Sequence, residues 1–561
     1  MDRRDFLTAG KITKANSVQV ASSPRTLSGI SPYTGVWGTN EIIHLLKRTM
    51  FGAKKTDVDF FGAMGVTQAV DYLLNVSTAQ SQPLPPVKDY PNSTDPLDPD
   101  NAIAAGQTWV NTNTTDGGSN FRRILSFKNW WMGQMVNQER NLLEKMTLFW
   151  HNHFATETND ISRAIWCYQN NAALRKNALG NFKSFVKEIT TDTGMLRYLN
   201  GYLNTAAAPD ENYGRELQEL FTVGKGANNA TPPYAEADVK AVAKVLTGWQ
   251  VNGTNNTSYF TASRHDTTSK QFSSFYNNTI ITGRSGATAG DMELNDLLNM
   301  IFATNDVAMH ICRKLYRWFV YYDIDAATEA NVITPLAQIF RTNNYDIKPV
   351  LSVLFKSEHF FDVLNQGCVI KSPVDFIVGL CREFAVQFPV ATDYTGNYSS
   401  WQSLNSLSIS LQQNIGDPPN VAGWQPYYQQ PQFHEIWINS DTFPKRNQFT
   451  DQMLLNGYTR GGKNIKIDII LFAKSLSNPG DPNALVSDAI TYLLRLPLQQ
   501  SSKDQLKKDI LLTGQINDYY WTNAWTAYIA NPNDITNANI VKTRLVNLFQ
   551  YLMKLAEYQL A

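Results

Sequence analysis

The sequence has little charge and no surplus of either sign. Its 561 residues include 49 Lys and Arg and 49 Asp and Glu, and charged residues make up only 17% of the chain. Because nucleic-acid binding depends on surplus Lys and Arg that release counterions from the phosphates, we expect no nucleic-acid partner. Asn, Thr, Ser and Gln take the place of charged residues, which suits a protein of the cell envelope or exterior.

Cysteines and long apolar runs are also scarce. Cys167, Cys312, Cys368 and Cys381 form no Cys-x-x-Cys pair and no zinc-knuckle spacing, so we predict buried thiols. No run of eighteen apolar residues occurs, and we therefore expect no transmembrane helix.

The common catalytic signatures are missing as well. The sequence contains no P-loop, no Gly-x-Gly-x-x-Gly after a strand, no Gly-x-Ser-x-Gly and no His-Glu-x-x-His. These absences exclude the most common kinase, dehydrogenase and hydrolase classes.

The first 36 residues are expected to form a polar N-terminal tail. Arg3-Arg4-Asp5-Phe6-Leu7 looks like a twin-arginine export motif, but residues 8–24 are polar where a signal peptide would be apolar. Two interpretations stay open. The protein is periplasmic, outer-membrane-associated or secreted if this segment is a signal, and cytoplasmic if it is not.

Helical periodicity dominates from residue 39 onward, and aromatic residues make up 12% of the chain. We predict a mainly α fold in which residues 37–561 form a single large helical domain of many helices. Long irregular loop insertions are expected near 79–118, 250–290 and 389–400, with at most a small β-hairpin from the pieces SYFTA and TIITG. The long helices expected are 119–136, 139–154, 161–179, 212–223, 235–249, 291–322, 327–342, 372–388, 441–457, 484–496 and 535–559.

His151 and His153 form the first candidate site. On a helix from Glu139 to Phe154, His153 falls within the apolar face, whereas His151 lies about 200° away around the helix. Both rings reach one site only if the helix ends there. His-x-His pairs bind metals in extended backbone, and the alternative is a core histidine that binds backbone or a carboxylate.

Two further helices carry polar residues of interest. Arg215 and Glu216 lie on the segment 210–224, where the bland alternative is a solvated face with a Glu211 to Arg215 pair. Asp238 falls on the apolar face of the helix 235–249, where a carboxylate needs a partner or a metal. A buried ion pair with Arg215, His153 or a cation is expected there.

His265, Asp266 and Lys270 are predicted to lie on a loop. Functional residues are common on loops, although an ordinary polar loop is the alternative.

These segments together resemble the bacterial family described as domain of unknown function 1800. The resemblance covers about residues 40–450 and rests on His44-Leu-Leu-Lys-Arg48 with Phe51-Gly52, Phe149-Trp-His-Asn-His-Phe154, Glu211-Asn-Tyr-Gly-Arg-Glu-Leu217 with Glu219-Leu-Phe221, Asp238-Val239 with Leu246-Thr-Gly-Trp249, His265-Asp266, and Pro418-Pro-Asn-Val-Ala-Gly-Trp424. It implies export, and a partner from a neighbouring exported family of sulfatase-like character, but it implies no activity. The chain departs from the family pattern in lacking the apolar signal region and in having Asp210 where Asn is expected.

Two functional hypotheses follow. The first is a metal-assisted or acid–base enzyme of the cell envelope that acts on an extracellular polymer. Its divalent metal, of undetermined identity, would be bound by His151, His153, Asp238 and His265, and its catalytic residues would be Asp238, Glu216, Arg215, His265, Asp266 and Lys270. The second is a non-catalytic helical scaffold or secretion partner whose polar residues form buried hydrogen-bond networks.

Overall fold

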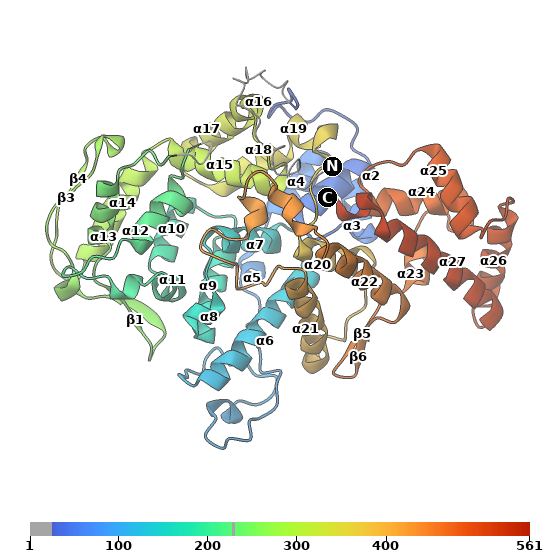
Figure 1. The fold of residues 1–561 in the computed structure, drawn as a ribbon, viewed down its shortest axis with the longest axis horizontal. Coiled ribbons are helices and arrows are strands. Elements are labelled where there is room, and N and C mark those ends of the chain that lie inside the picture. The colour runs from blue at the N-terminus through green and yellow to red at the C-terminus, as the bar shows by residue number, and fades with distance from the viewer. Residues whose placement is uncertain (1–24, 227–230) are drawn as a thin grey trace, which may run out of the picture.

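The computed structural model describes residues 25–226 and 231–561, and the fold is mainly α-helical as predicted (Figure 1). The twin-arginine-like start lies outside the described residues. The helices of eight or more residues are α2 (Thr39–Thr49), α3 (Lys55–Gly62), α4 (Val66–Leu74), α6 (Gly117–Val136), α7 (Leu143–His153), α9 (Ala164–Lys176), α10 (Phe182–Thr190), α13 (Glu236–Val245), α14 (Ala289–Phe302), α15 (Asp306–Phe319), α17 (Thr334–Thr342), α18 (Ile347–Phe355), α20 (Pro373–Glu383), α21 (Tyr394–Ser410), α22 (Thr442–Leu455), α24 (Pro482–Leu493), α26 (Tyr519–Ala530) and α27 (Ile535–Lys554). The shorter ones are α5 (Thr78–Ser81), α8 (Thr158–Ile161), α11 (Thr193–Tyr198), α12 (Asn212–Glu216), α16 (Ala326–Thr328), α19 (Glu358–Phe361), α23 (Ile469–Lys474) and α25 (Gln500–Gln505). Within the described ranges, no helix combines the length and apolar character needed to cross a membrane.

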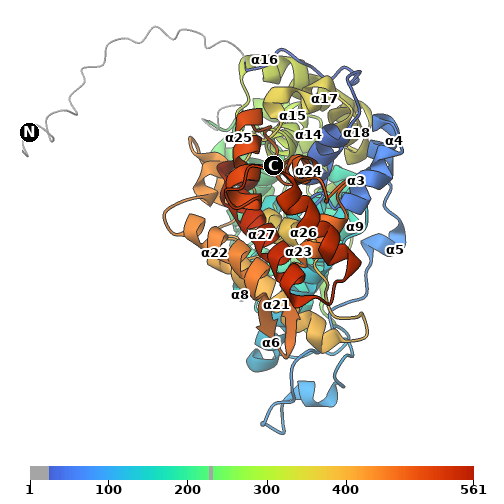
Figure 2. The ribbon, with the colours of Figure 1, turned by 90° about the vertical axis from the view of Figure 1, so that its right-hand side faces the viewer.

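The helices are arranged around a central group. Helices α10 to α14 form one end of the molecule and α24 to α27 the other, with α2, α7 and α20 between them (Figure 1). Helices α6 and α21 pack side by side and extend to one edge of the molecule in both views (Figures 1 and 2). The last residues return to the centre, where the backbone N–H of Ala561 donates to the carbonyl of Val369 at 2.9 Å.

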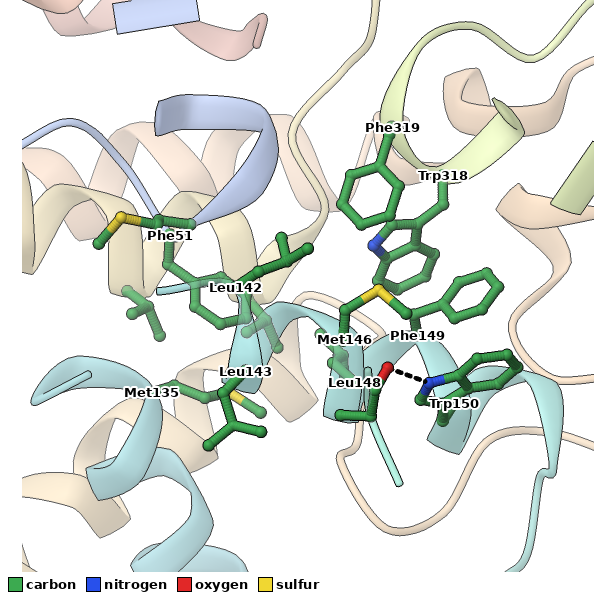
Figure 3. Packing of buried hydrophobic residues seen from close by; sticks show 14 of the residues in the cluster. Phe51, Met135, Leu142, Leu143, Met146, Leu148, Phe149, Trp150, Trp318 and Phe319 are labelled. Atoms are coloured by element: carbon green, nitrogen blue, oxygen red, sulfur yellow. Dashed lines mark hydrogen bonds between the residues drawn. The ribbon is translucent and has the colours of Figure 1, made fainter. Parts of the chain in front are cut away.

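Helix α7 lies in the core, and all of its residues are buried. Trp150 is fully buried, and its Nε1 donates to the carbonyl of Ala178 at 2.9 Å. Phe149 meets Trp318 of α15 edge-to-face at 5.5 Å between ring centroids (Figure 3). Helix α7 is therefore enclosed by its neighbours, and every polar side chain on it must find its partner inside the protein.

The four cysteines are free thiols, as the sequence predicted. Cys368 is half-buried, whereas Cys167, Cys312 and Cys381 are buried. Burial raises the pKa of these three thiols, which keeps them protonated at neutral pH.

The single long helix predicted over 291–322 is two helices, α14 and α15. The carbonyl of Phe302, left free where α14 ends, accepts a hydrogen bond of 2.6 Å from the hydroxyl of Tyr345. The hydroxyl of Thr304 also bonds back to the carbonyl of Ile301 at 2.8 Å. These hydrogen bonds satisfy backbone carbonyls at the end of α14. The chain can therefore leave the helix there without leaving these carbonyls unpaired.

The loop predicted over 389–400 is wrong for its second half, because α21 begins at Tyr394. Asp393 caps the helix by accepting from the N–H of Gly396 at 2.9 Å. The helix is rich in Ser and Asn, which are poor helix formers, and its pattern therefore looked irregular. Packing on α6 overrides that preference, and Trp401 lies so close to Gly133 that a Cβ there would sit 2.6 Å from the indole ring.

The segment 250–290 forms two hairpins rather than one. Strand β1 (Trp249–Asn252) pairs with β2 (Thr257–Phe260), and β3 (Lys270–Gln271) pairs with β4 (Ile280–Ile281). The pieces SYFTA and TIITG therefore contribute to different sheets. A third hairpin, β5 (Tyr458–Arg460) with β6 (Lys463–Ile465), was not predicted although its Gly461-Gly462 turn is a hairpin signal.

Candidate functional site

His151 and His153 occupy the last turn of α7 but have different surroundings. The ring of His151 lies 5.1 Å from that of Trp131 and 5.7 Å from that of Trp424. Its Nε2 is buried and meets no hydrogen-bond partner among the described residues. Burial lowers the pKa of His151 to about 4, so the ring is neutral at physiological pH.

His153 points inward as predicted and binds the backbone of a neighbouring helical turn. Its Nε2 lies 3.1 Å from the carbonyl of Phe221, and its Nδ1 lies 3.1 Å from Nζ of Lys314. Lys314 and His310 both bind the carbonyl of Leu220, at 3.2 and 2.9 Å. Burial lowers the pKa of Lys314 to about 7. These three side chains cap the π-helical turn Leu217–Thr222, where the widened backbone leaves carbonyls free.

Asp238 is fully buried and accepts hydrogen bonds only from its surroundings in α13 and the loop after β3. The N–H of Ala235 donates to it at 2.8 Å, and the N–H and hydroxyl of Ser273 donate at 2.7 Å each. The expected ion pair with Arg215 or His153 is absent from the described contacts of Asp238. Its charge is instead stabilised by these donors and by the start of the helix.

His265 and Asp266 lie on the loop between β2 and β3 as predicted, whereas Lys270 is the first residue of β3, and all three side chains are buried. His265 Nε2 lies 3.1 Å and Lys270 Nζ 2.7 Å from the carboxylate of Glu293, which is itself fully buried. Asp266 is more distant, 3.8 Å from Lys270. Sequence reasoning missed Glu293 because it lies on α14, far along the chain from the other three.

Arg215 and Glu216 lie in a fourth environment. Arg215 binds Glu236 through two hydrogen bonds of 2.8 and 2.7 Å and approaches Glu211 at 3.5 Å, as the solvated-face alternative expected. Burial, with the charge of Glu219 as the second cause, raises the pKa of Glu216 to about 7.

The predicted residues therefore belong to separate networks. Over residues 25–226 and 231–561, no group of three or more His, Cys, Asp or Glu is placed to hold a metal ion. The residues proposed as metal ligands do not fit a common metal centre, because His153, Asp238 and His265 are each bound to different partners.

A different site lies in an enclosed cavity at the centre of the molecule, with a volume of about 30 Å³. Segments far apart in the sequence meet there: α2, α7, α15, the start of α20 and the residues around 425–437. The lining includes five basic side chains and one carboxylate, together with aromatic rings and a histidine: Lys47, Arg48, Lys145, Arg317, Lys371, Asp375, Trp318, Tyr322, Tyr427, Phe433, Trp437 and His434. We call this the cationic cavity.

Two of its basic residues have acidic partners. Lys47 binds Glu383 at 2.9 Å, and Lys145 forms an ion pair with Asp375. The lining carboxylate is therefore already paired.

The other three basic residues, Arg48, Arg317 and Lys371, have no carboxylate within 4.0 Å among the described residues. Arg48 donates to the carbonyl of Asn365 at 3.2 Å, and Arg317 donates to that of Tyr322 at 3.1 Å. Neutral carbonyls do not compensate a full charge, so the cavity keeps a surplus of positive charge.

Lys371 is the most exceptional of the three. Its side chain is buried, and burial and neighbouring charges, with no hydrogen bond, determine the surroundings of its Nζ within the described part of the chain. The Nζ lies 4.1 Å from the centre of the Tyr558 ring. Burial, followed by the charge of Lys47, lowers the pKa of Lys371 to about 7. Its backbone is fixed, since its N–H donates to Gln559 and its carbonyl accepts from Arg446, at 2.8 and 2.9 Å.

The unpartnered buried atoms of the lining are hydrogen-bond donors. Nε of Arg48 and Nε1 of Trp318 meet no acceptor among the described residues. His434 accepts at Nδ1 from the N–H of Ile370 at 3.3 Å, which places its proton on Nε2, and this atom is also unpartnered. Burial lowers the pKa of His434 to about 4, so the ring is neutral. A cavity with surplus cations and free donors is chemically suited to an anion.

Comparison with known protein families identifies the family to which the chain belongs. The model of the family described as protein of unknown function (DUF1800) matches residues 44–560. The chain belongs to this family. No curated protein and no solved structure matches it. Two segments that carry the resemblance to DUF1800, those around Arg48 and Trp424, adjoin or line the cavity of this DUF1800 protein.

The sequence held a signal for the cavity that our reasoning missed. Lys145 lies between Leu142 and Phe149 on the inward face of α7, and Lys47 lies between Ile43 and Met50 in the same way on α2. A lysine at helical spacing within an apolar face is buried and needs a partner. What the sequence could not show is that these lysines meet at one place.

Proposed function

We propose that this DUF1800 protein binds a small anionic ligand in the cationic cavity and that Lys371 exchanges a proton with it. The observation that carries the proposal is the group Arg48, Arg317 and Lys371, which have no carboxylate partner among the described residues. Arg48 and Lys371 are buried, and Arg317 is half-buried. Burying a charge without compensation is unfavourable. A bound anion would supply the missing charge.

The chemistry of the ligand follows from the donors around the cavity. A phosphate, sulfate or carboxylate group accepts several hydrogen bonds at once, and a guanidinium such as that of Arg48 binds these groups with two parallel bonds. The cavity volume of about 30 Å³ limits the enclosed part of the ligand to a single group of this kind. Because the pKa of Lys371 is lowered to about 7, its amine can both take up and release a proton near neutral pH.

We place this acid–base chemistry in the cell envelope, as the family resemblance and the low proportion of charged residues, 17%, favour. An anionic group carried on an extracellular polymer is a substrate of the required chemistry.

Titration of the purified protein with inorganic phosphate, sulfate and acetate tests the binding. We expect one equivalent of at least one anion to bind, and we expect Arg48→Gln and Lys371→Met each to weaken it by about 10- to 100-fold, because hydrogen bonds to charged groups contribute about 1.5–3 kcal/mol. Lys348→Met removes an exposed lysine of α18 and is the matched control, which should bind as the unaltered protein does.

Calorimetry at low and at about 0.15 M salt separates the buried site from surface attraction, which salt screens. Absence of binding by the unaltered protein, or unchanged binding by Lys371→Met, would contradict the proposal.

Lys371→Met is also expected to stabilise the protein in a pH-dependent way. The pKa of Lys371 is lower in the folded protein than its ordinary value of 10.5. The unfolded chain therefore binds more protons between about pH 7 and 10.5, and stability rises with pH across that window. Replacement by Met should raise the free energy of unfolding by about 1–4 kcal/mol at about pH 6 and by little near pH 10. Urea unfolding in chloride buffers at both pH values measures this, and a uniform loss of stability would refute it.

A non-catalytic scaffold is the second candidate, favoured by buried ion pairs that join separate elements. Arg175 of α9 binds Glu144 of α7 at 2.9 Å, and Lys270 of β3 binds Glu293 of α14 at 2.7 Å. Pairs of this kind fix how helices pack. If no anion binds, co-purification with an exported partner from the envelope fraction is the experiment that tests the scaffold.

A further inference from the structure

A second site lies in an open groove that shares no lining residue with the cationic cavity. Its volume is about 590 Å³, within the range of about 300–1,000 Å³ typical of ligand pockets. It is lined by residues of α9, the segment 81–83, the end of α10, the start of α11 and the turn between β1 and β2.

The basic side chains along the groove are paired with carboxylates. Arg175 is bound to Glu144 at 2.9 Å, and Lys176 is bound to Glu188 at 3.0 Å. Asp192 is half-buried and accepts from Asn170 at 2.9 Å, and burial raises its pKa to about 6. The groove therefore offers no unpaired cation to an anionic ligand, in contrast to the cationic cavity, and Asp192 is its carboxylate without a basic partner within the described residues.

Neutral hydrogen-bonding side chains dominate the lining instead. They are Ser81, Gln82, Gln169, Thr191, Thr193, Asn256, Thr257 and Ser258. Gln169 is held in place from both sides: its amide nitrogen donates to the carbonyl of Asn256 at 3.1 Å, and its amide oxygen accepts from the hydroxyl of Thr193 at 3.1 Å. A fixed amide with remaining hydrogen-bonding capacity is suited to a ligand with many hydroxyl groups.

Aromatic rings provide the apolar part of the groove. Tyr168 is half-buried and meets the buried Trp130 edge-to-face, with 5.8 Å between the ring centroids. Ala172, one turn further along α9, is small and leaves the space beside the Tyr168 ring open. An aromatic face next to neutral amides matches the two sides of a sugar ring, whose C–H groups are apolar and whose hydroxyls are polar.

We propose that this groove binds a neutral oligosaccharide, with Tyr168 packing against a sugar ring and Gln169 binding its hydroxyl groups. The protein would then have two separate binding sites, the cationic cavity for an anion and this groove for a carbohydrate chain.

Isothermal titration calorimetry tests the groove. The ligands are the β-1,4-linked and α-1,4-linked hexamers of glucose and the β-1,4-linked hexamer of N-acetylglucosamine. We expect at least one neutral oligomer to bind with a dissociation constant below about 1 mM, and Tyr168→Ala to weaken it at least 10-fold, about 1.4 kcal/mol. Ala172→Trp should abolish binding by filling the space beside Tyr168. Ala527→Trp, a half-buried alanine of α26 at the other end of the molecule, is the matched control and should bind normally.

Circular dichroism checks that each variant folds. If Ala172→Trp does not fold, Gln169→Leu is used instead, since Leu and Gln are of nearly the same size. Failure of every neutral oligomer to bind, or unchanged binding by Tyr168→Ala and Gln169→Leu, overturns the proposal. Binding of uronic-acid oligomers alone also overturns it, because the basic residues of the groove are already paired with carboxylates. Phosphate should not displace the oligosaccharide, and the result is therefore independent of the cationic cavity.

Discussion

Replacing Glu293 with Gln is expected to lower the free energy of unfolding by about 3–5 kcal/mol, because it removes the carboxylate that lies 2.7 Å from the Nζ of the buried Lys270. Glu293 is fully buried and accepts from Lys270 Nζ at 2.7 Å and from the N–H of Arg284 at 2.7 Å. His265 Nε2 lies 3.1 Å away on the other side. The nearest other carboxylate, that of Asp266, is 3.8 Å from Lys270 and cannot replace it.

Urea unfolding measures this change, and Glu236→Gln is its matched control, since Glu236 also binds a basic residue but is exposed. The control should leave the unfolding curve unchanged.

The difference in free energy of unfolding between the unaltered protein and Glu293→Gln should also depend on pH. Burial opposes ionisation of Glu293, but hydrogen bonds from His265 and Lys270 hold its pKa below the usual value. The stability that this carboxylate contributes is thus lost as pH falls through its pKa in the folded protein. The unaltered protein and Glu293→Gln should therefore have more similar free energies of unfolding in acid. A glutamine variant as stable as the unaltered protein at neutral pH would show that the network is not structural.

Asp238→Ala is expected to lower the free energy of unfolding by about 2–4 kcal/mol, because several hydrogen bonds to one buried carboxylate are lost together. Most of the helix content should remain. The alanine leaves the N–H groups of Ala235 and Ser273 without an acceptor. It also frees the loop after β3, which the two bonds of 2.7 Å from Ser273 hold to α13.

Asp306→Ala is a control for the general effect of a carboxylate at a helix start, since Asp306 also lies in the first turn of a helix, α15, whose start has no side-chain cap hydrogen bond. Asp306→Ala should lower the free energy of unfolding by less, within about 1 kcal/mol. Elemental analysis of the same samples separates the two interpretations of Asp238. A transition metal that disappears in Asp238→Ala would support a metal ligand, and unchanged metal content with lost stability would support a structural network.

The helical class of the fold could be predicted because it depends on local pattern. The apolar residues of α7 recur at helical spacing, and Met146 and Trp150 among them are fully buried in the core (Figure 3). The break between α14 and α15 could not be predicted in the same way. It depends on Tyr345, a residue some forty positions away, which satisfies the end of α14.

The candidate site was harder to predict than the fold. The sequence indicated that His153 and Asp238 are buried polar residues, and both are. It did not indicate their partners. His153 binds the carbonyl of Phe221 and Asp238 binds Ser273, so residues that looked like one constellation belong to different networks.

The sequence by itself determined the family, the mainly helical class and the burial of individual polar side chains, since each depends on spacing along the chain. Only the tertiary structure decided that Lys47, Lys145 and Lys371 meet in one cavity, and that the acidic residues nearby leave Arg48 and Arg317 without a carboxylate. The physical reason is that charge compensation acts through space over a few ångströms. The order of residues along the chain does not reveal which charges will be neighbours once helices from distant segments have packed together.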